Sequence, residues 1–176
     1  MAYPKRTAVT LTAVCTGLGL LTVPAAAAPA GGSHVIWAKG PTYTYDKAYG
    51  DVTTRIRVKT HKGTTSVRLK AKGFPAAAKG KTFGVHVHQK ACGPKPADAG
   101  PHYQNPNAKP GTPLHDKEIW LDVTVGRDGE ARSKTTVPWV VAKGDAGSVV
   151  VHAEPTDHHT GGAGDRLLCT TVPFGS

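Results

Sequence analysis

Apolar and polar residues alternate along much of this chain, and no segment beyond residue 30 keeps the 3.6-residue apolar period of an amphipathic helix. Residues 52–60 and 65–71 alternate on either side of a His61–Lys62–Gly63 turn, which predicts a β-hairpin. Further strands are predicted over residues 82–88, 119–125, 131–140, 148–153 and 166–174. The pattern predicts an all-β fold, a Greek-key β-barrel or flattened β-sandwich of about eight antiparallel strands.

Two segments, 90–114 and 154–165, lack any periodicity. Glycine and proline are abundant, at 21 and 14 of 176 residues, which suits short strands joined by many turns. Long loops in a small β domain commonly carry the functional residues. We therefore expect both segments to be functional loops.

The first thirty residues have the pattern of a signal peptide. Lys5 and Arg6 precede an uncharged apolar stretch from Ala8 to Val23, and small residues follow at Ala25–Ala28. The stretch is short for a membrane span, so stable membrane insertion is not expected. We predict a signal peptide over 1–28 with cleavage between 27 and 30, a flexible N-terminus over 29–34, and one domain over 35–176. The mature protein would be exported, either secreted or associated with the cell wall.

Cleavage changes the cysteine count. Cys15 leaves with the peptide, so Cys92 and Cys169 remain, and an even count in an exported chain favours one disulfide. The alternative is a Cys–His nucleophile pair, which oxidation to a disulfide would block.

The chain is basic, with a net charge of +10 that falls to +8 after cleavage. The cationic residues are dispersed and have no aromatic strand platform beside them, so nucleic acid is not an expected partner. Association with anionic cell-surface polymers fits the charge. Several lysines are interpreted as a solvated basic face: Lys59, Lys62, Lys70, Lys72, Lys79 and Lys81.

Nine histidines raise the question of a metal. His86 and His88 share one face of the predicted strand 82–88 with Gly84, which would leave the surface beside them open, whereas Phe83, Val85 and Val87 share the other, apolar face. Alone, such a short pattern favours two half-exposed histidines on a polar face over a metal site.

Two more histidines complete a possible four-nitrogen site. His102 lies on the first long loop, and His152 ends a strand that leads into the second. Four imidazoles suit Cu(II). His34, His61, His158 and His159 are interpreted as solvated, the alternative for His158 and His159 being that they gather copper or tune its access. The three tryptophans are interpreted as core or barrel-end aromatics: Trp37, Trp120 and Trp139.

Four motifs resemble the copper–zinc superoxide dismutases, in order and with similar gaps: Gly84–His88, Ala99–His102, Val150–Ala153 and Gly164–Cys169. The resemblance runs from about Val35 to Phe174 and is to the exported bacterial type. It implies a Greek-key barrel holding one copper per chain, with the ligands His86, His88, His102 and His152. It also implies catalytic roles for His102 and for Arg166, which would attract superoxide, and a disulfide between Cys92 and Cys169.

The zinc side departs from the family pattern. Pro110 stands where the family has its second zinc histidine, which leaves at most His102, His115 and Glu118, with Asp116 beside them. A structural zinc site needs four ligands. The chain is therefore similar to copper-only relatives that have a short second loop. In such a chain Glu118 would lie behind His102 and accept its ring N–H.

The resemblance implies an exported superoxide dismutase that converts superoxide to oxygen and hydrogen peroxide by alternating Cu(II) and Cu(I). The alternative is an extracytoplasmic copper-binding or copper-buffering protein on the same fold, since a fold does not fix a function. Arg166 favours the enzyme, because a storage protein has no use for an anion-attracting arginine. The sequence predicts no oligomeric state, since it shows no clear exposed apolar stripe.

Overall fold

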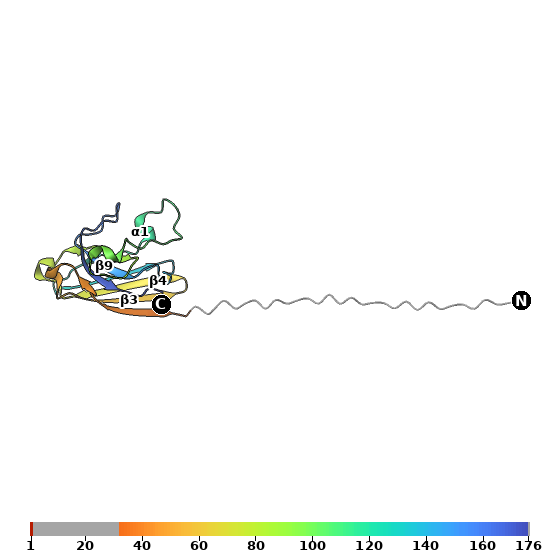
Figure 1. The fold of residues 1–176 in the computed structure, drawn as a ribbon, viewed down its shortest axis with the longest axis horizontal. Helices are drawn as coiled ribbons and strands as arrows, with labels where there is room; N and C mark the ends of the chain where they lie inside the picture. The colour runs from red at the N-terminus through yellow and green to blue at the C-terminus, as the bar shows by residue number, and fades with distance from the viewer. Residues whose placement is uncertain (2–31, 176) are drawn as a thin grey trace. The chain divides into compact units, whose positions relative to one another are not determined.

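The computed structural model of the chain describes Met1 and residues 32–175 (Figure 1). The predicted signal peptide apart from Met1, and residues 29–31 of the predicted flexible N-terminus, lie outside the described residues. His34, the last residue of that predicted segment, begins a strand. No helix among those described is long and apolar enough to span a membrane.

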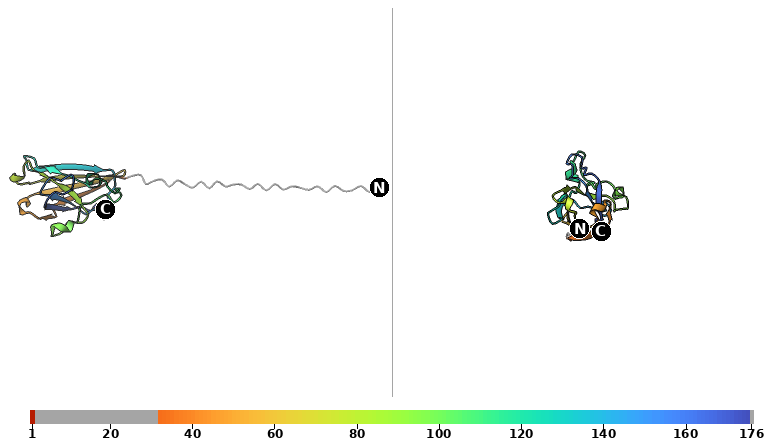
Figure 2. Two further views of the ribbon diagram at one scale, coloured as in Figure 1. Left: turned by 90° about the horizontal axis from the view of Figure 1, so that it is seen from above. Right: turned by 90° about the vertical axis from the view of Figure 1, so that its left-hand side faces the viewer.

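Two four-stranded antiparallel sheets form the domain (Figure 2). The first sheet has the order β1-β3-β4-β8, with strands β1 (His34–Gly40), β3 (Thr53–His61), β4 (Thr64–Lys72) and β8 (Glu130–Val137). The second sheet has the order β2-β10-β9-β6, with strands β2 (Tyr43–Thr44), β10 (Arg166–Thr171), β9 (Ser148–His152) and β6 (Val85–His88). Strands β5 (Thr82–Phe83) and β7 (Val123–Thr124) pair with each other. The fold is the predicted all-β Greek-key barrel.

Within residues 32–175, helical structure is limited to four short pieces. One is the α-helix α1 (Leu114–Lys117). The others are the 3-10 helices η1 (Lys47–Tyr49), η2 (Ala76–Ala78) and η3 (Pro96–Ala99).

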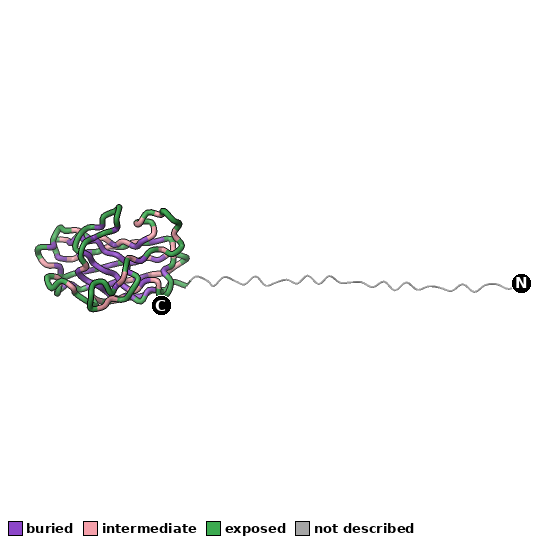
Figure 3. Tube along the Cα trace, turned by 45° about the horizontal axis from the view of Figure 1, so that its top comes forward, coloured by how far each residue is buried: buried purple, intermediate pink, exposed green. Residues whose placement is uncertain are grey.

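The predicted hairpin over 52–71 is formed by β3 and β4. Its turn consists of Lys62 and Gly63, whose φ angles of 46° and 76° match the left-handed turn that two-residue hairpins prefer. Inward residues such as Val58 and Leu69 are at most 2% exposed and belong to the same core as Val87 and Val149 of the second sheet. The alternation seen in the sequence therefore separates a shared core from two outer faces (Figure 3).

The strand predicted over 82–88 is broken at Gly84. Strand β5 pairs with β7, whereas β6 pairs with β9. A Cβ at Gly84 would lie 2.5 Å from Ala163 Cβ and 2.8 Å from Thr156 Oγ1. The expectation that Gly84 leaves an open surface is therefore wrong, because the second long loop packs directly on it.

The predicted strand 119–125 is also shorter than expected. Only Val123–Thr124 forms a strand, while Leu121 N donates to Val85 O at 2.7 Å and Val87 N donates to Ile119 O at 3.1 Å. These bonds attach the segment to the free edge of β6. They place residues 118–122 beside the two histidines of that strand.

Candidate metal centre

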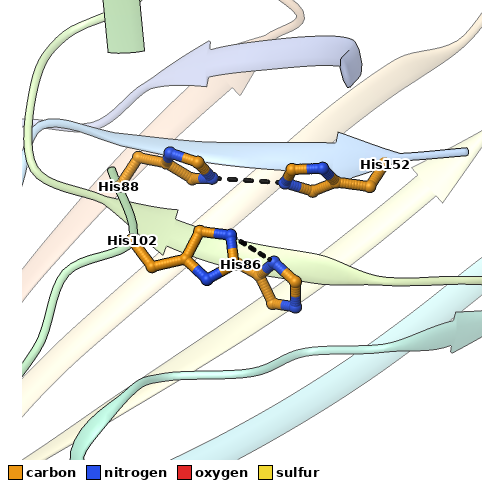
Figure 4. A group of neighbouring side chains, drawn as sticks. All are labelled: His86, His88, His102 and His152. Atoms are coloured by element: carbon orange, nitrogen blue, oxygen red, sulfur yellow. Dashed lines mark hydrogen bonds between the residues drawn. The ribbon is translucent and has the colours of Figure 1, made fainter. Parts of the chain in front are cut away.

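Four histidines gather on the outer side of the second sheet, at β6 and the end of β9 (Figure 4). His86 and His88 come from β6, and His152 ends β9. His102 reaches them from the first loop, since it forms a β-bridge with His88 and Tyr103 N donates to Val87 O at 2.8 Å. One nitrogen from each ring lies within 4.8 Å of the others. The structure thus brings together the four predicted copper ligands.

The inward nitrogens face one another in two close pairs. His86 Nδ1 lies 2.9 Å from His102 Nε2, and His88 Nε2 lies 3.2 Å from His152 Nε2 (Figure 4). An ion bound by imidazole nitrogens at about 2 Å requires neighbouring nitrogens about 3 Å apart and opposite ones about 4 Å apart. The separations in the structure fit that requirement.

The outward nitrogens of three rings each face an oxygen that accepts a hydrogen bond. His88 Nδ1 lies 2.9 Å from Gly100 O, His152 Nδ1 lies 3.1 Å from Gly164 O, and His102 Nδ1 lies 3.0 Å from Glu118 Oε2. A carbonyl or carboxylate oxygen can only accept from an imidazole, so these outward nitrogens carry the hydrogens. A neutral ring has a single N–H, and the inward nitrogens therefore present lone pairs.

The fourth ring is oriented through a hydroxyl group, which sequence reasoning missed. His86 Nε2 lies 2.7 Å from Thr156 Oγ1, and that hydroxyl donates to Asp122 Oδ1 at 2.7 Å. Because its one hydrogen goes to the carboxylate, Thr156 Oγ1 accepts from His86 Nε2. Four lone pairs then converge on one point, an arrangement suited to a cation. Neither residue could be identified from the sequence, because Thr156 lies in a loop without periodicity and Asp122 belongs to no motif.

The three ligands from strands are held neutral. They are at most 4% exposed. Burial, followed by the neighbouring imidazoles, lowers the pKa of His86 to about 2; burial likewise lowers the pKa of His88 to about 3 and that of His152 to about 4. Neutral imidazole is the form that binds a metal.

Glu118 lies behind His102, as the sequence predicted. Its carboxylate also accepts from Trp120 Nε1 at 2.7 Å and from Gln104 Nε2 at 2.9 Å. Burial by itself would raise the pKa of Glu118, but the hydrogen bonds from His102, Trp120 and Gln104 outweigh it and lower the pKa. The carboxylate therefore stays charged and keeps the hydrogen of His102 on Nδ1.

The remaining candidates for a zinc site do not gather. His115 is exposed and lies 3.3 Å from Asp116, and it is outside the four-histidine group. Both oxygens of Glu118 are engaged, and the indole of Trp120 packs between the rings of His115 and His158 at centroid distances of 6.4 and 5.5 Å. Among residues 32–175, the four histidines are the one group of metal-ligating side chains close enough to hold an ion.

Arg166 begins β10 directly opposite His152. Its guanidinium donates to Pro96 O at 2.6 Å and to Gly100 O at 2.7 Å, and Gly100 O is also the partner of His88. Two of its five N–H groups are used in these bonds. The side chain of His102 is 19% exposed, so solvent reaches the site past this ring.

A disulfide between Cys92 and Cys169 ties the first loop to β10, with Cα atoms 5.8 Å apart. The same loop carries Pro96 and Gly100, the acceptors of Arg166. The disulfide and the arginine therefore hold one loop against one strand at the edge of the histidine group. A disulfide at these two residues is incompatible with the alternative of a Cys–His nucleophile pair.

Comparison with known proteins assigns the fold and the family. A model of the copper/zinc superoxide dismutase family matches residues 49–172. A solved structure described as the clock protein EA4 aligns with a TM-score of 0.55 at 18% identity, over 80% of this chain and 93% of the other, which shows a shared fold. No curated protein sequence matches the chain. The chain belongs to the copper/zinc superoxide dismutase family.

Proposed function

We propose that this protein is a copper-dependent superoxide dismutase, which converts two superoxide anions and two protons to oxygen and hydrogen peroxide. One observation carries the proposal: four imidazole lone pairs converge on one point, next to an arginine that keeps unused N–H donors. Copper, when bound, would supply the one-electron chemistry by alternating between Cu(II) and Cu(I). The ligands would be His86, His88, His102 and His152, with one copper per chain.

Arg166 would bind and orient the substrate. Superoxide is a small anion, and a cation fixed at the edge of the site attracts it and donates hydrogen bonds to it. The carbonyl groups of Pro96 and Gly100 hold the guanidinium in place before the anion arrives. Binding then requires little reorganisation.

His102 would be the ligand that gives up reduced copper, takes a proton on Nε2 and passes that proton to the product peroxide. It is the most exposed of the four rings, and Glu118 fixes the hydrogen on its other nitrogen.

The site would work with copper alone. Pro110 offers no side-chain ligand, His115 lies outside the histidine group, and Glu118 is fully used by His102, Trp120 and Gln104. These observations support a copper-only site with no tight zinc.

The protein would be exported, with a signal peptide over 1–28 and the enzyme domain over 35–176. His34, the last residue of the segment 29–34 predicted to be flexible, belongs to β1 and pairs with Thr60. The Cys92–Cys169 disulfide supports the proposed export. Superoxide would be its substrate, and anionic cell-surface polymers a second class of partner.

Superoxide decay distinguishes the enzyme from a copper-buffering protein on the same fold. Protein loaded with one copper per chain should remove superoxide far faster than an equal amount of copper held by a four-histidine peptide. Arg166→Gln should keep the copper and lose about tenfold or more in rate, since it removes the anion-binding charge. Copper at one per chain without superoxide loss above the peptide control would leave only the copper-binding protein.

A further inference from the structure

The outer face of the first sheet carries nine cationic side chains, called the basic face below. On each of its strands, outward residues alternate with buried ones. The nine are Lys39 from β1, Arg55, Arg57 and Lys59 from β3, Arg68, Lys70 and Lys72 from β4, and Arg132 and Lys134 from β8.

The strand register aligns these cations in rows across the sheet. One row runs Lys39, Arg55, Lys70 and Arg132, so that each is the direct partner of the next. The next row runs Trp37, Arg57, Arg68 and Lys134. Neighbouring strands are about 4.8 Å apart, so a row spans about 14 Å.

The rows are almost without acidic partners. Glu130 is the one acidic residue on these four strands, and it pairs with Arg132. Like charges directly opposite one another in a sheet repel. Repulsion among these cations therefore raises the free energy of the free protein. An anion lying across the face would reduce that repulsion.

The surface between the rows is hollowed. A depression of about 340 Å³ is lined by Trp37, Arg55, Arg57, Arg68 and Lys70. A second depression, of about 480 Å³, lies beside it along Arg55, Lys70 and Arg132. The lining guanidinium groups can each take two oxygens of a phosphate in bidentate fashion.

We propose that the basic face binds a linear phosphodiester polymer of the cell surface. Rows of cations with hollows between them match a flexible chain whose charges repeat along its length. A lipid surface fits less well, because membrane-bound faces present several protruding apolar groups. On these four strands the exposed large apolar side chains are Val35 and Trp37, both from β1, and Arg57 lies 5.6 Å from the ring centroid of Trp37. A rigid nucleic-acid duplex would touch fewer cations of a twisted sheet.

The basic face and the histidine group lie on opposite sides of the core. Val85 and Val87 of β6 point into the core that Ile56 and Val58 of β3 enter from the other sheet. The histidines of β6 and the arginines of β3 therefore point away from each other. A polymer on the basic face leaves the metal centre open, so the two activities are independent.

Polymer binding is tested with two variants of equal charge. The face variant carries Arg55→Gln, Arg57→Gln, Arg68→Gln and Lys70→Gln. The control variant carries Lys47→Gln, Lys79→Gln, Lys81→Gln and Lys143→Gln, at exposed positions away from the face. The probe is purified polyol-phosphate wall polymer, titrated between about 50 and 200 mM NaCl.

We expect the face variant to weaken binding at least about tenfold and to flatten the dependence on salt, while the control stays within about twofold of the unchanged protein. Equal losses in the two variants would overturn the proposal, since only the net charge would matter. Tighter binding to duplex DNA or to phosphatidylglycerol vesicles than to the polymer would overturn the assigned partner.

Copper content and superoxide decay are measured on the same samples. Both should be unchanged in the face variant, with or without polymer. A failure of polymer binding with intact superoxide decay would refute this inference and the polymer partner on which it rests, but not the proposed enzyme. Polymer binding without superoxide decay would refute only the proposed enzyme.

Discussion

The outer face of the second sheet is built to hold a metal ion, whereas the outer face of the first sheet is suited to bind an anionic polymer. On the second sheet, two loops cover the histidines and every ring nitrogen of the four has a polar neighbour. On the first sheet, cations stand in rows, exposed and mostly unpaired. A metal requires lone pairs fixed in position, which only buried and hydrogen-bonded side chains provide. A charged polymer requires cations spaced along its path, which the exposed rows of a bare sheet supply.

The largest expected difference between the faces is in metal binding. His86→Ala should abolish stoichiometric copper binding, because it removes one of four converging nitrogens. His61→Ala, on the first sheet, is the matched control and should bind one copper per chain. Elemental analysis of dialysed protein makes the comparison. Retention of one tight copper by His86→Ala would contradict the assigned site.

The metal-free protein should lose stability as the pH falls. The ordinary pKa of histidine is 6.5, whereas those of His86, His88 and His152 are about 2, 3 and 4 in the folded chain. Between pH 6.5 and about 4 the unfolded chain therefore binds protons that the folded chain does not, which favours unfolding by on the order of a few kcal/mol.

Urea midpoints between pH 7 and 4.5 measure this effect. His86→Gln should show a shallower decline, because one of the depressed groups is gone. A midpoint independent of pH in the unchanged protein would show that these rings are not held neutral by the fold.

Removing the hydroxyl behind His86 should weaken copper binding. Thr156→Val leaves His86 Nε2 without an acceptor and breaks the link to Asp122. We expect a loss of about 10- to 100-fold in copper affinity and a changed Cu(II) electron paramagnetic resonance spectrum. Thr136→Val on the first sheet should change neither. An unaltered spectrum in Thr156→Val would show that the hydroxyl group of Thr156 does not orient His86.

A smaller effect is expected at Glu118. Glu118→Gln keeps the shape but removes the charge behind His102, so turnover should slow several-fold and its pH dependence should shift while copper stays bound. Glu130→Gln makes the same change on the first sheet and should have no effect on turnover. An identical pH profile in Glu118→Gln would argue against proton delivery through His102.

The smallest effect is expected on the basic face. Arg68 stands between Arg57 and Lys134, so Arg68→Gln should relieve repulsion and raise the melting temperature by roughly 1–3 °C at low salt. The gain should vanish at about 1 M NaCl, where charges are screened. A lower melting temperature at low salt would mean that the rows do not repel.

The sequence allowed much of the metal side to be predicted, because a period of two residues places His86 and His88 on one face. It also predicted the β3–β4 hairpin, whose turn residues are distinctive. The break at Gly84 and the Asp122–Thr156 link could not be predicted, since they depend on how a distant loop packs.

The basic face was only partly predicted. Lys59, Lys70 and Lys72 were interpreted as solvated, and the cations were judged dispersed along the chain. In the structure they align, because strand register sets their neighbours. Trp37, predicted to lie in the core or at a barrel end, is 60% exposed in one of the rows. The basic face could have been predicted from the hairpin over 52–71, because its outward positions are mostly lysine and arginine.

Superoxide decay of protein reconstituted with copper and no zinc tests the central claim most directly. We expect one copper per chain to give full activity, and added zinc neither to bind tightly nor to raise the rate. A rate that depends on one tight zinc per chain, lost in His115→Ala, would contradict the copper-only site. A rate no higher than that of the copper–peptide control would contradict the enzyme itself.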